Sequence, residues 1–122
     1  MSEALATEET DRLIASDKVE GTSVYDRAGE KIGSVRNFMV GKRSGQVEYA
    51  VLQFGGIFGI GNEFYPIPWE MLSYHKDKHG YVVGLDKQQV EAAPRYSAES
   101  PDFDHRYGRT IYDYYGIAYP FI

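Results

Sequence analysis

The residues VEYAVLQFGGIFGIGNEFYPIPW, positions 47–69, decide the fold of this chain. The first eight are rich in β-branched and aromatic residues and are apolar at successive positions, which is typical of a strand buried on both faces. The glycines at 55, 56, 59 and 61 allow the chain to turn back without a Cβ clash. Residues 63–67 are therefore predicted to return as a second strand beside the first.

Two prolines restrict this second strand. Pro66 and Pro68 have no N–H, which restricts the strand to an edge of the sheet or restricts the prolines to its last residues. Pro68 also stands where proline is best tolerated at the start of a helix, and it predicts a helical turn beginning at Trp69. The large indole of Trp69 is expected to seal one end of the folded core rather than to line a ligand pocket.

The glycine-rich connection is also the kind of segment that can hold a phosphate. Phosphate-binding loops join a strand to a helix, however, and this one is predicted to join two strands. Its glycine spacing differs from the dinucleotide fingerprint, and no Lys-Ser or Lys-Thr pair follows it. We expect a wide hairpin connection and no nucleotide cofactor. Ile57, Phe58 and Ile60 would be exposed at its tip unless the chain's own tail or a partner covers them.

Several short patterns follow one another in a recognisable order: GTSVY at 21–25, GEKIGSV at 29–35, SG at 44–45, YAVL at 49–52, the glycine-rich loop, and YPIPW at 65–69. Together they resemble a PRC-barrel domain over residues 16–94. That family includes the cytoplasmic part of the H subunit of the purple-bacterial photosynthetic reaction centre and the C-terminal domain of a ribosome maturation factor. The resemblance implies a small, partly open β-barrel that serves as a docking or regulatory module and not as an enzyme. Unlike those relatives, this sequence shows neither a membrane helix nor a second domain.

The chain as a whole is predicted to be all-β: a small, partly open antiparallel barrel over 17–94, with short helices. A flexible acidic arm over 1–16 precedes the barrel, and an aromatic, helical extension over 95–122 follows it. Further strands are predicted over 17–25, 31–40, 72–75 and 81–85. The irregular apolar pattern near Gly33 predicts a bulge. Asp86 is a good N-cap for a short helix over 87–93.

Composition and charge exclude several classes of protein. A chain of 122 residues that is 43% hydrophobic is expected to form one globular domain. The net charge of −5 comes mostly from residues 1–16, and no basic stripe indicates nucleic-acid binding. The absence of cysteine excludes disulfides and thiolate ligands. No apolar run could cross a bilayer and no secretory signal is evident, so we expect a cytoplasmic protein.

No group of residues indicates catalysis or metal binding. His75 and His79 have a spacing that suits a metal only on a helix, and Lys76-Asp77-Lys78 between them predicts a turn with exposed histidines. Carboxylates are scattered over predicted turns, and no nucleophile–histidine–acid pattern is present. We therefore expect no catalytic, cofactor-binding or metal-binding residues and no small-molecule ligand.

The C-terminal segment has a different character, because aromatic residues are concentrated over 102–122. A helix over 104–115 would place Tyr107, Ile111, Tyr114 and Tyr115 on one stripe. Such a stripe must be buried, either against the chain's own barrel or against a second subunit, and the pattern leaves both open. The candidate interaction residues are Ile57, Phe58, Ile60, Tyr107, Ile111, Tyr114, Tyr115, Tyr119 and Phe121.

These observations predict a non-catalytic protein-interaction or adaptor module that self-associates, most simply as a homodimer. Two alternatives rest on the family resemblance. One is a ribosome- or RNA-associated assembly factor, and the other is an accessory protein of a photosynthetic or respiratory membrane complex. Stacking of RNA bases on the tyrosines would need an adjoining cationic groove, and only three arginines are near.

Overall fold

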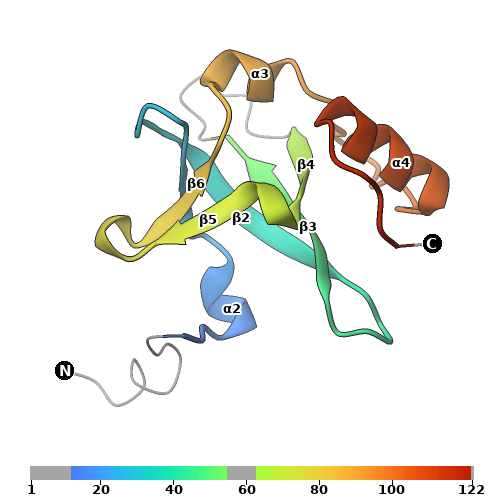
Figure 1. The fold of residues 1–122 in the computed structure, drawn as a ribbon, viewed down its shortest axis with the longest axis horizontal. Coiled ribbons are helices and arrows are strands. Elements are labelled where there is room, and N and C mark those ends of the chain that lie inside the picture. Colours follow the sequence, from blue (N-terminus) through green and yellow to red (C-terminus); the bar gives the residue numbers. More distant parts are fainter. Residues whose placement is uncertain (1–11, 55–62, 122) are drawn as a thin grey trace.

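The computed structural model describes residues 12–54 and 63–121. Six strands form a single sheet: β1 (Ser23–Tyr25), β2 (Lys31–Val40), β3 (Val47–Gln53), β4 (Phe64–Pro68), β5 (Leu72–His75) and β6 (Gly80–Val83). The helical elements are α2 (Ser16–Val19), α3 (Lys87–Glu91), α4 (His105–Tyr114) and the 3₁₀ turns η2 (Trp69–Met71) and η3 (Lys76–Lys78). The strand order is β4-β3-β2-β1-β6-β5, and the sheet curls into a half-barrel (Figure 1).

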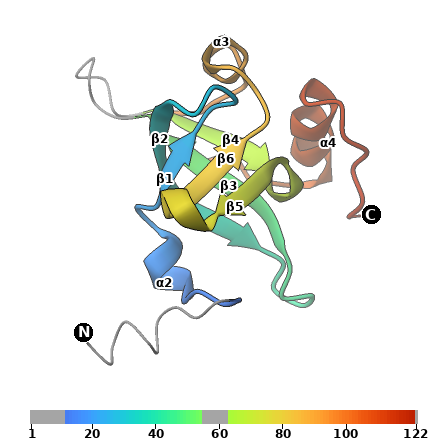
Figure 2. The same cartoon turned by 60° about the vertical axis from the view of Figure 1, so that its left-hand side comes forward.

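The strand β3 is buried on both faces, as its sequence predicts. Its four central residues, Tyr49 to Leu52, are all buried. Because neighbouring side chains of a strand point to opposite faces, Ala50 and Leu52 join the barrel core while Tyr49 and Val51 lie on the other face. The outer face of β3 therefore needs a cover of its own, and α4 lies beside it (Figure 2).

The strand β4 lies at an edge of the sheet, as its prolines predict. It pairs only with β3, where Val51 is opposite Pro66 and Tyr49 is opposite Pro68. On its outer side, Phe64 exchanges two backbone hydrogen bonds with Tyr96, of 2.8 and 3.0 Å. This edge is therefore closed to a further strand, by missing N–H groups at the prolines and by Tyr96 at the other end.

The prediction of an antiparallel barrel is wrong for one strand pair, because β1 and β6 run parallel. The hairpins β1–β2, β2–β3 and β3–β4 each reverse the chain. The connection through η2 does not, because the strand pairings leave β4 and β5 running in the same direction at opposite edges of the sheet. This one connection without reversal leaves β6 pointing in the same direction as β1, so the sheet is mixed.

Near the N-terminus, the prediction of a bulge is confirmed and the predicted start of the first strand is wrong. The bulge near Gly33 is confirmed, because Val24 is opposite Gly33 while Tyr25 is opposite Lys31. The first strand, predicted to begin at 17, begins only at Ser23. Residues Ser16–Val19 instead form the short helix α2, which brings the Val19 side chain into the core. The acidic arm predicted over 1–16 lies mostly outside the described residues.

Short helical elements cover parts of the half-barrel core. The helix α3 begins at Asp86, whose side chain accepts from the Gln89 N–H at 2.8 Å, and it buries Val90 against the core. Trp69 is half-buried, with its ring 4.8 Å from Phe38 and 5.5 Å from Tyr81. Its indole covers part of the core, but, unlike the prediction, its remaining surface also lines a hollow.

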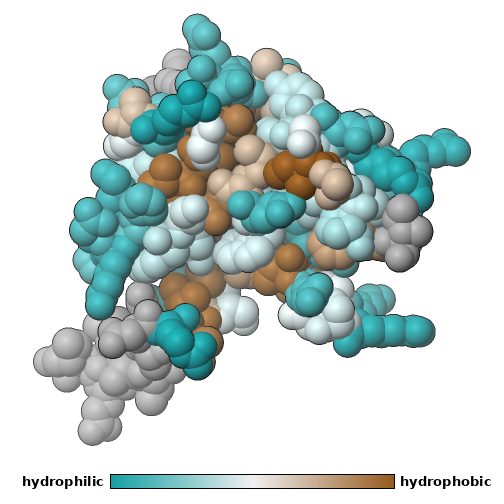
Figure 3. Space-filling view, viewed as in Figure 1, coloured by the Kyte–Doolittle hydropathy of each residue, from teal (hydrophilic) through white to brown (hydrophobic). Residues whose placement is uncertain are grey.

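On the face that Figure 3 shows, hydrophobic residues lie mostly toward the middle and hydrophilic residues around the margin. Large apolar side chains that stay well exposed are few among the described residues: Leu13, Val40, Tyr74 and Tyr114. They lie in different elements, so most of the apolar surface of the described chain is buried within it. Within that part of the chain, no helix combines the length and the apolar character needed to span a membrane.

Candidate functional site

The helix α4 is positioned by local signals at both of its ends. At the start, the Asp104 carboxylate accepts from the Tyr107 N–H at 2.9 Å, which caps the helix. At the end, Gly116 takes a positive φ of 73°, and the chain turns back along α4. Tyr119 then reaches the start of the helix, where its hydroxyl lies 2.9 Å from His105 Nδ1. Residues 102–121 thus form one packed unit, here called the C-terminal segment.

The C-terminal segment packs on the outer face of β3 and β4, and we call this contact the seam. Tyr49 of β3 lies at its centre, with its ring 5.2 Å from Phe103 and 5.7 Å from Tyr112. Tyr112 in turn contacts Tyr119 at 5.2 Å and Phe121 at 5.9 Å. All four pairs meet edge to face, which is a favourable geometry for aromatic rings.

The helix stripe that faces the barrel shares Ile111 and Tyr115 with the predicted stripe and differs from it at the other positions. The buried positions are Gly108, Ile111 and Tyr112, and Tyr115 is half-buried beside the core. Tyr114, predicted to share the buried stripe, is 46% exposed. The helical periodicity did not identify Gly108 as a buried position. A Cβ at Gly108 would overlap the Tyr119 ring and lie 2.6 Å from Tyr49 Oη. Glycine lets the helix approach β3 closely, so it belongs on the buried face although it is not hydrophobic.

The other predicted interaction residues are placed as follows. Ile111 is fully buried, while Tyr107, Tyr119 and Phe121 are half-buried within the C-terminal segment. Ile57, Phe58 and Ile60 lie outside the described residues. The structure therefore brings the tail residues together on the chain's own barrel. Sequence reasoning did not assign Tyr49, Phe103 and Tyr112 to this site, although they form its centre.

The tyrosine hydroxyls at the seam are in different environments. Tyr112 donates to the Glu48 carbonyl oxygen at 2.7 Å, and Tyr114 donates to the Gln89 carbonyl oxygen at 3.1 Å. The buried hydroxyls of Tyr49 and Tyr115 have no hydrogen-bond partner among the described residues. Burial is the main reason why the pKa of Tyr107 rises to about 12 and the pKa values of Tyr49, Tyr112 and Tyr115 rise further. These tyrosines are therefore neutral near pH 7.

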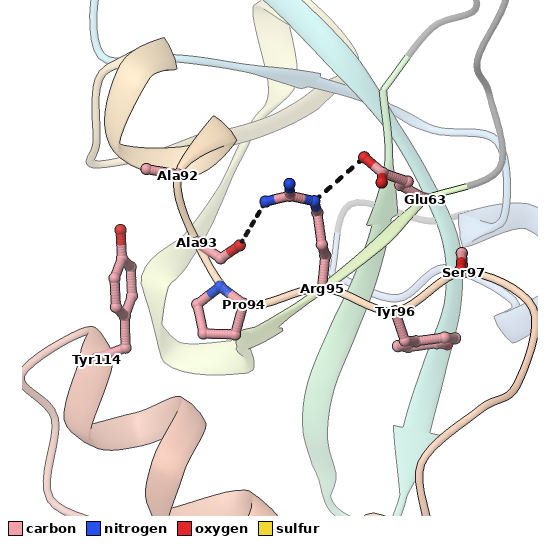
Figure 4. Close-up of a pocket in the computed structure, with 8 residues that line it drawn as sticks. All are labelled: Glu63, Ala92, Ala93, Pro94, Arg95, Tyr96, Ser97 and Tyr114. Carbon is pink, nitrogen blue, oxygen red and sulfur yellow. Dashed lines mark hydrogen bonds and ion pairs between the residues drawn. The ribbon is translucent and has the colours of Figure 1, made fainter.

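One hollow at the seam has a volume of about 540 Å³ and lies between Glu63, residues 92–97 and Tyr114 (Figure 4). Arg95 Nε is 3.2 Å from Glu63 Oε1, and its Nη1 donates to the carbonyl oxygens of Glu91 and Ala93 at 3.4 Å. Figure 4 shows Tyr114 across the hollow from this group. The Arg95 guanidinium is already paired with Glu63 and with two backbone carbonyls, and these contacts fix the linker that follows α3.

Two smaller hollows lie farther along the seam. One, of about 250 Å³, is lined by Met39, Val40, Gly41, Glu48, Tyr49, Asp102 and Phe103. The other, of about 280 Å³, is lined by Gln46, Val47, Trp69, Glu70, Tyr112, Pro120 and Phe121. The second combines three aromatic rings with one carboxylate and is here called the aromatic hollow. This composition is suited to contact with a partner side chain rather than to acid–base chemistry.

The two histidines with a possible metal spacing lie on either side of a turn. His75 ends β5 and His79 follows η3 with a positive φ of 51°, and both are exposed. Across the described ranges 12–54 and 63–121, no group of three or more metal-binding side chains is present.

One known protein is similar to most of this chain. A protein of Deinococcus radiodurans, described as uncharacterized, is 30% identical over 92 residues. The match covers 70% of this chain but 32% of the relative, so the chain spans about a third of the length of that protein. The family model described as PRC-barrel domain matches residues 11–90, which include all six strands and stop before α4. The chain therefore belongs to the PRC-barrel family.

Proposed function

We propose that this chain is a non-catalytic protein-interaction module whose binding face is the surface of the seam. The observation that carries the proposal is the aromatic character of this surface. Tyr114 is 46% exposed, and Trp69, Tyr119 and Phe121 are each half-buried beside hollows or the docked tail. Partly exposed aromatic side chains beside pockets are the residues that dominate the binding energy of many protein interfaces.

The exposed rings are held in place, which favours binding. Tyr114 is fixed by its hydrogen bond to Gln89 and by an edge-to-face contact of 4.9 Å with Tyr115. Phe121 is fixed by contacts with Tyr112 and with Tyr119, at 5.9 and 5.6 Å. A partner that binds rings already ordered in this way loses less conformational entropy on association. The resemblance to PRC-barrel docking modules supports the same function, although only by analogy of fold.

The partner that we propose is a second copy of the chain, in a closed two-fold dimer. The edge of β4 is blocked by its prolines and by Tyr96, so this edge does not favour pairing between sheets. Side chains of the seam would make the contact instead. A small barrel also has a thin core, and burial of aromatic surface between two copies would add to its stability.

Light scattering over a range of protein concentrations tests the proposal. We expect the full chain to be dimeric at high micromolar concentration, and Tyr114→Ser to weaken the dimer by about 2 kcal/mol, a typical loss for an interfacial aromatic residue. Tyr74→Ser is the matched control, because Tyr74 has a similar exposure of 40% but lies in β5, away from the seam.

Removal of the whole C-terminal segment would be a poor test, since it would uncover Tyr49 and Val51 and create a new apolar surface. A full chain that stays monomeric at high micromolar concentration would contradict self-association. A dimer weakened equally by Tyr74→Ser and Tyr114→Ser would move the interface away from the seam.

A further inference from the structure

The aromatic hollow has walls that come from four separate parts of the chain, one of which is Gln46 and Val47. Trp69 and Glu70 lie at the end of β4, Tyr112 lies on α4, and Phe121 lies in the tail. Trp69 is held from the barrel side by Phe38 and Tyr81. Tyr112 is only 2% exposed and is anchored by its hydrogen bond to the Glu48 carbonyl. The hollow is therefore built by packed elements and not by one side chain.

Among the described residues that line this hollow, Glu70 is the one that carries a charge. Glu70 lines it and is exposed, so its carboxylate is accessible from solvent. Burial raises the pKa of Tyr112 most, and the charges of Glu48 and Glu70 raise it further. The described lining residues include no base. Lys42 and Arg43, in the turn before Gln46, are exposed and do not line it.

We infer that the aromatic hollow binds a basic side chain, lysine or arginine, of a protein partner. A cation is attracted by the faces of aromatic rings, most strongly by tryptophan, and a carboxylate at the rim adds a direct charge attraction. The aliphatic stem of lysine or arginine would lie against Val47 and Pro120, while its charged end would face Glu70. This inference rests on the proposed protein-interaction function and names the chemistry of its partner.

An anionic ligand does not fit the same site, because Glu70 would repel it and no described lining residue offers a positive charge. A neutral apolar side chain would fill the volume but would leave Glu70 without a role in binding. The charge of Glu70 therefore distinguishes a cation site from an ordinary apolar groove, and it is the feature that the experiment changes.

Trp69 provides a local probe, since it is the single tryptophan of the chain. Three blocked peptides would be titrated while tryptophan fluorescence is recorded: acetyl-Gly-Lys-Gly-amide, acetyl-Gly-Arg-Gly-amide and a norleucine peptide that has the lysine stem without its charge. We expect a saturable change with the lysine and arginine peptides and binding about three- to tenfold weaker with norleucine. High salt should weaken the binding of both basic peptides.

Two variants test the walls of the hollow. Glu70→Gln keeps the size of the side chain and removes its charge, so it should weaken binding of the basic peptides about threefold or more. Phe121→Leu should weaken it as well, by loss of one ring. Glu20→Gln is the matched control, because Glu20 follows α2, well away from the C-terminal segment in Figures 1 and 2. It should leave peptide binding unchanged.

Any one of three results would overturn the inference. The first is that the basic peptides cause no saturable change in fluorescence, and the second is that the norleucine peptide binds as tightly as the lysine peptide. The third is that the Glu70→Gln variant binds the basic peptides as tightly as the original protein does. The proposed function is measured separately by the oligomeric state of the same variants. If the peptides fail to bind while Tyr114→Ser still weakens the dimer, only the cation site is wrong. If the full chain is monomeric and the basic peptides bind with the expected dependence on Glu70, self-association is wrong and the cation site stands.

Discussion

Tyr49 and Tyr112 are in contact at the centre of the seam, but only one of their two hydroxyls is hydrogen-bonded among the described residues. The Tyr112 hydroxyl donates to the Glu48 carbonyl at 2.7 Å, whereas the Tyr49 hydroxyl has no partner among the described residues. Both side chains are almost fully buried, at 2% and 1% exposed. A buried hydroxyl without a partner has lost its hydrogen bonds to water and gained nothing in exchange. The same chemical group should therefore stabilise the fold at one position and destabilise it at the other.

Removal of the two hydroxyls should change the free energy of unfolding in opposite directions. We expect Tyr49→Phe to be neutral or stabilising by up to about 1 kcal/mol, because it removes an unpaired polar group. Tyr112→Phe should cost about 1 to 2 kcal/mol, because it leaves the Glu48 carbonyl unpaired. Urea unfolding monitored by circular dichroism measures both. A loss of stability of the same size in both variants would show that Tyr49 Oη is hydrogen-bonded in solution.

At the scale of elements, the contact between α4 and β3 depends on a glycine. Gly108 lies on the buried face of the helix, and a methyl group there would overlap the Tyr119 ring and the Tyr49 hydroxyl. Alanine is the better helix former by about 1 kcal/mol, so helix propensity alone would predict that Gly108→Ala is stabilising. We expect the overlap to outweigh propensity, with a net loss of about 1 to 3 kcal/mol in unfolding free energy.

Thermal and urea unfolding of Gly108→Ala check this prediction. Gly84→Ala is the control, since no atom lies within 4 Å of a Cβ at Gly84 and the change should stay within about 0.5 kcal/mol. A Gly108→Ala protein at least as stable as the original would show that α4 can move away from β3 at little cost.

The same element shows what the sequence could and could not predict. Periodicity counts hydrophobic residues, and so it assigned Tyr114 to the stripe and passed over Gly108, whose role depends on the surface opposite. The strands were better predicted, because the signals of β3 and β4 are local: β-branched residues, and prolines without an N–H. The parallel pairing of β1 with β6 had no local signal. It results from the connection η2, which leads from one sheet edge to the other without reversing the chain.

At the scale of the whole molecule, the candidate site is made by distant parts of the chain. The aromatic hollow combines Gln46, Trp69 and Phe121, which are far apart in sequence. The sequence indicated that the tail must be buried, but it could not determine which face of the sheet receives it. The tail packs on the outer face of β3, because Tyr49 and Val51 on that face would otherwise be exposed to water. Tail and barrel are thus predicted to unfold as one unit, because each leaves apolar surface exposed without the other.

The buried tyrosines predict how this unit responds to alkaline pH. Burial is the main cause of raised pKa values at six tyrosines: Tyr49, Tyr65, Tyr107, Tyr112, Tyr115 and Tyr119. In the unfolded chain a tyrosine ionises near pH 10, whereas folded Tyr107 ionises near pH 12. The contribution of these neutral side chains to the free energy of unfolding is fully present below about pH 10. It decreases as the pH rises toward the pKa values of the folded protein.

Alkaline unfolding should therefore be steep and should begin above about pH 10. Each tyrosine that is neutral when folded and ionised when unfolded lowers stability by about 1.4 kcal/mol per pH unit. Tyrosinate absorbance and circular dichroism, followed together during a pH titration, check this. The absorbance change of the buried tyrosines should appear only as the circular dichroism signal is lost. Ionisation of nearly all eleven tyrosines before any loss of structure would contradict it, because the seam would then have to open to solvent while the barrel stays folded.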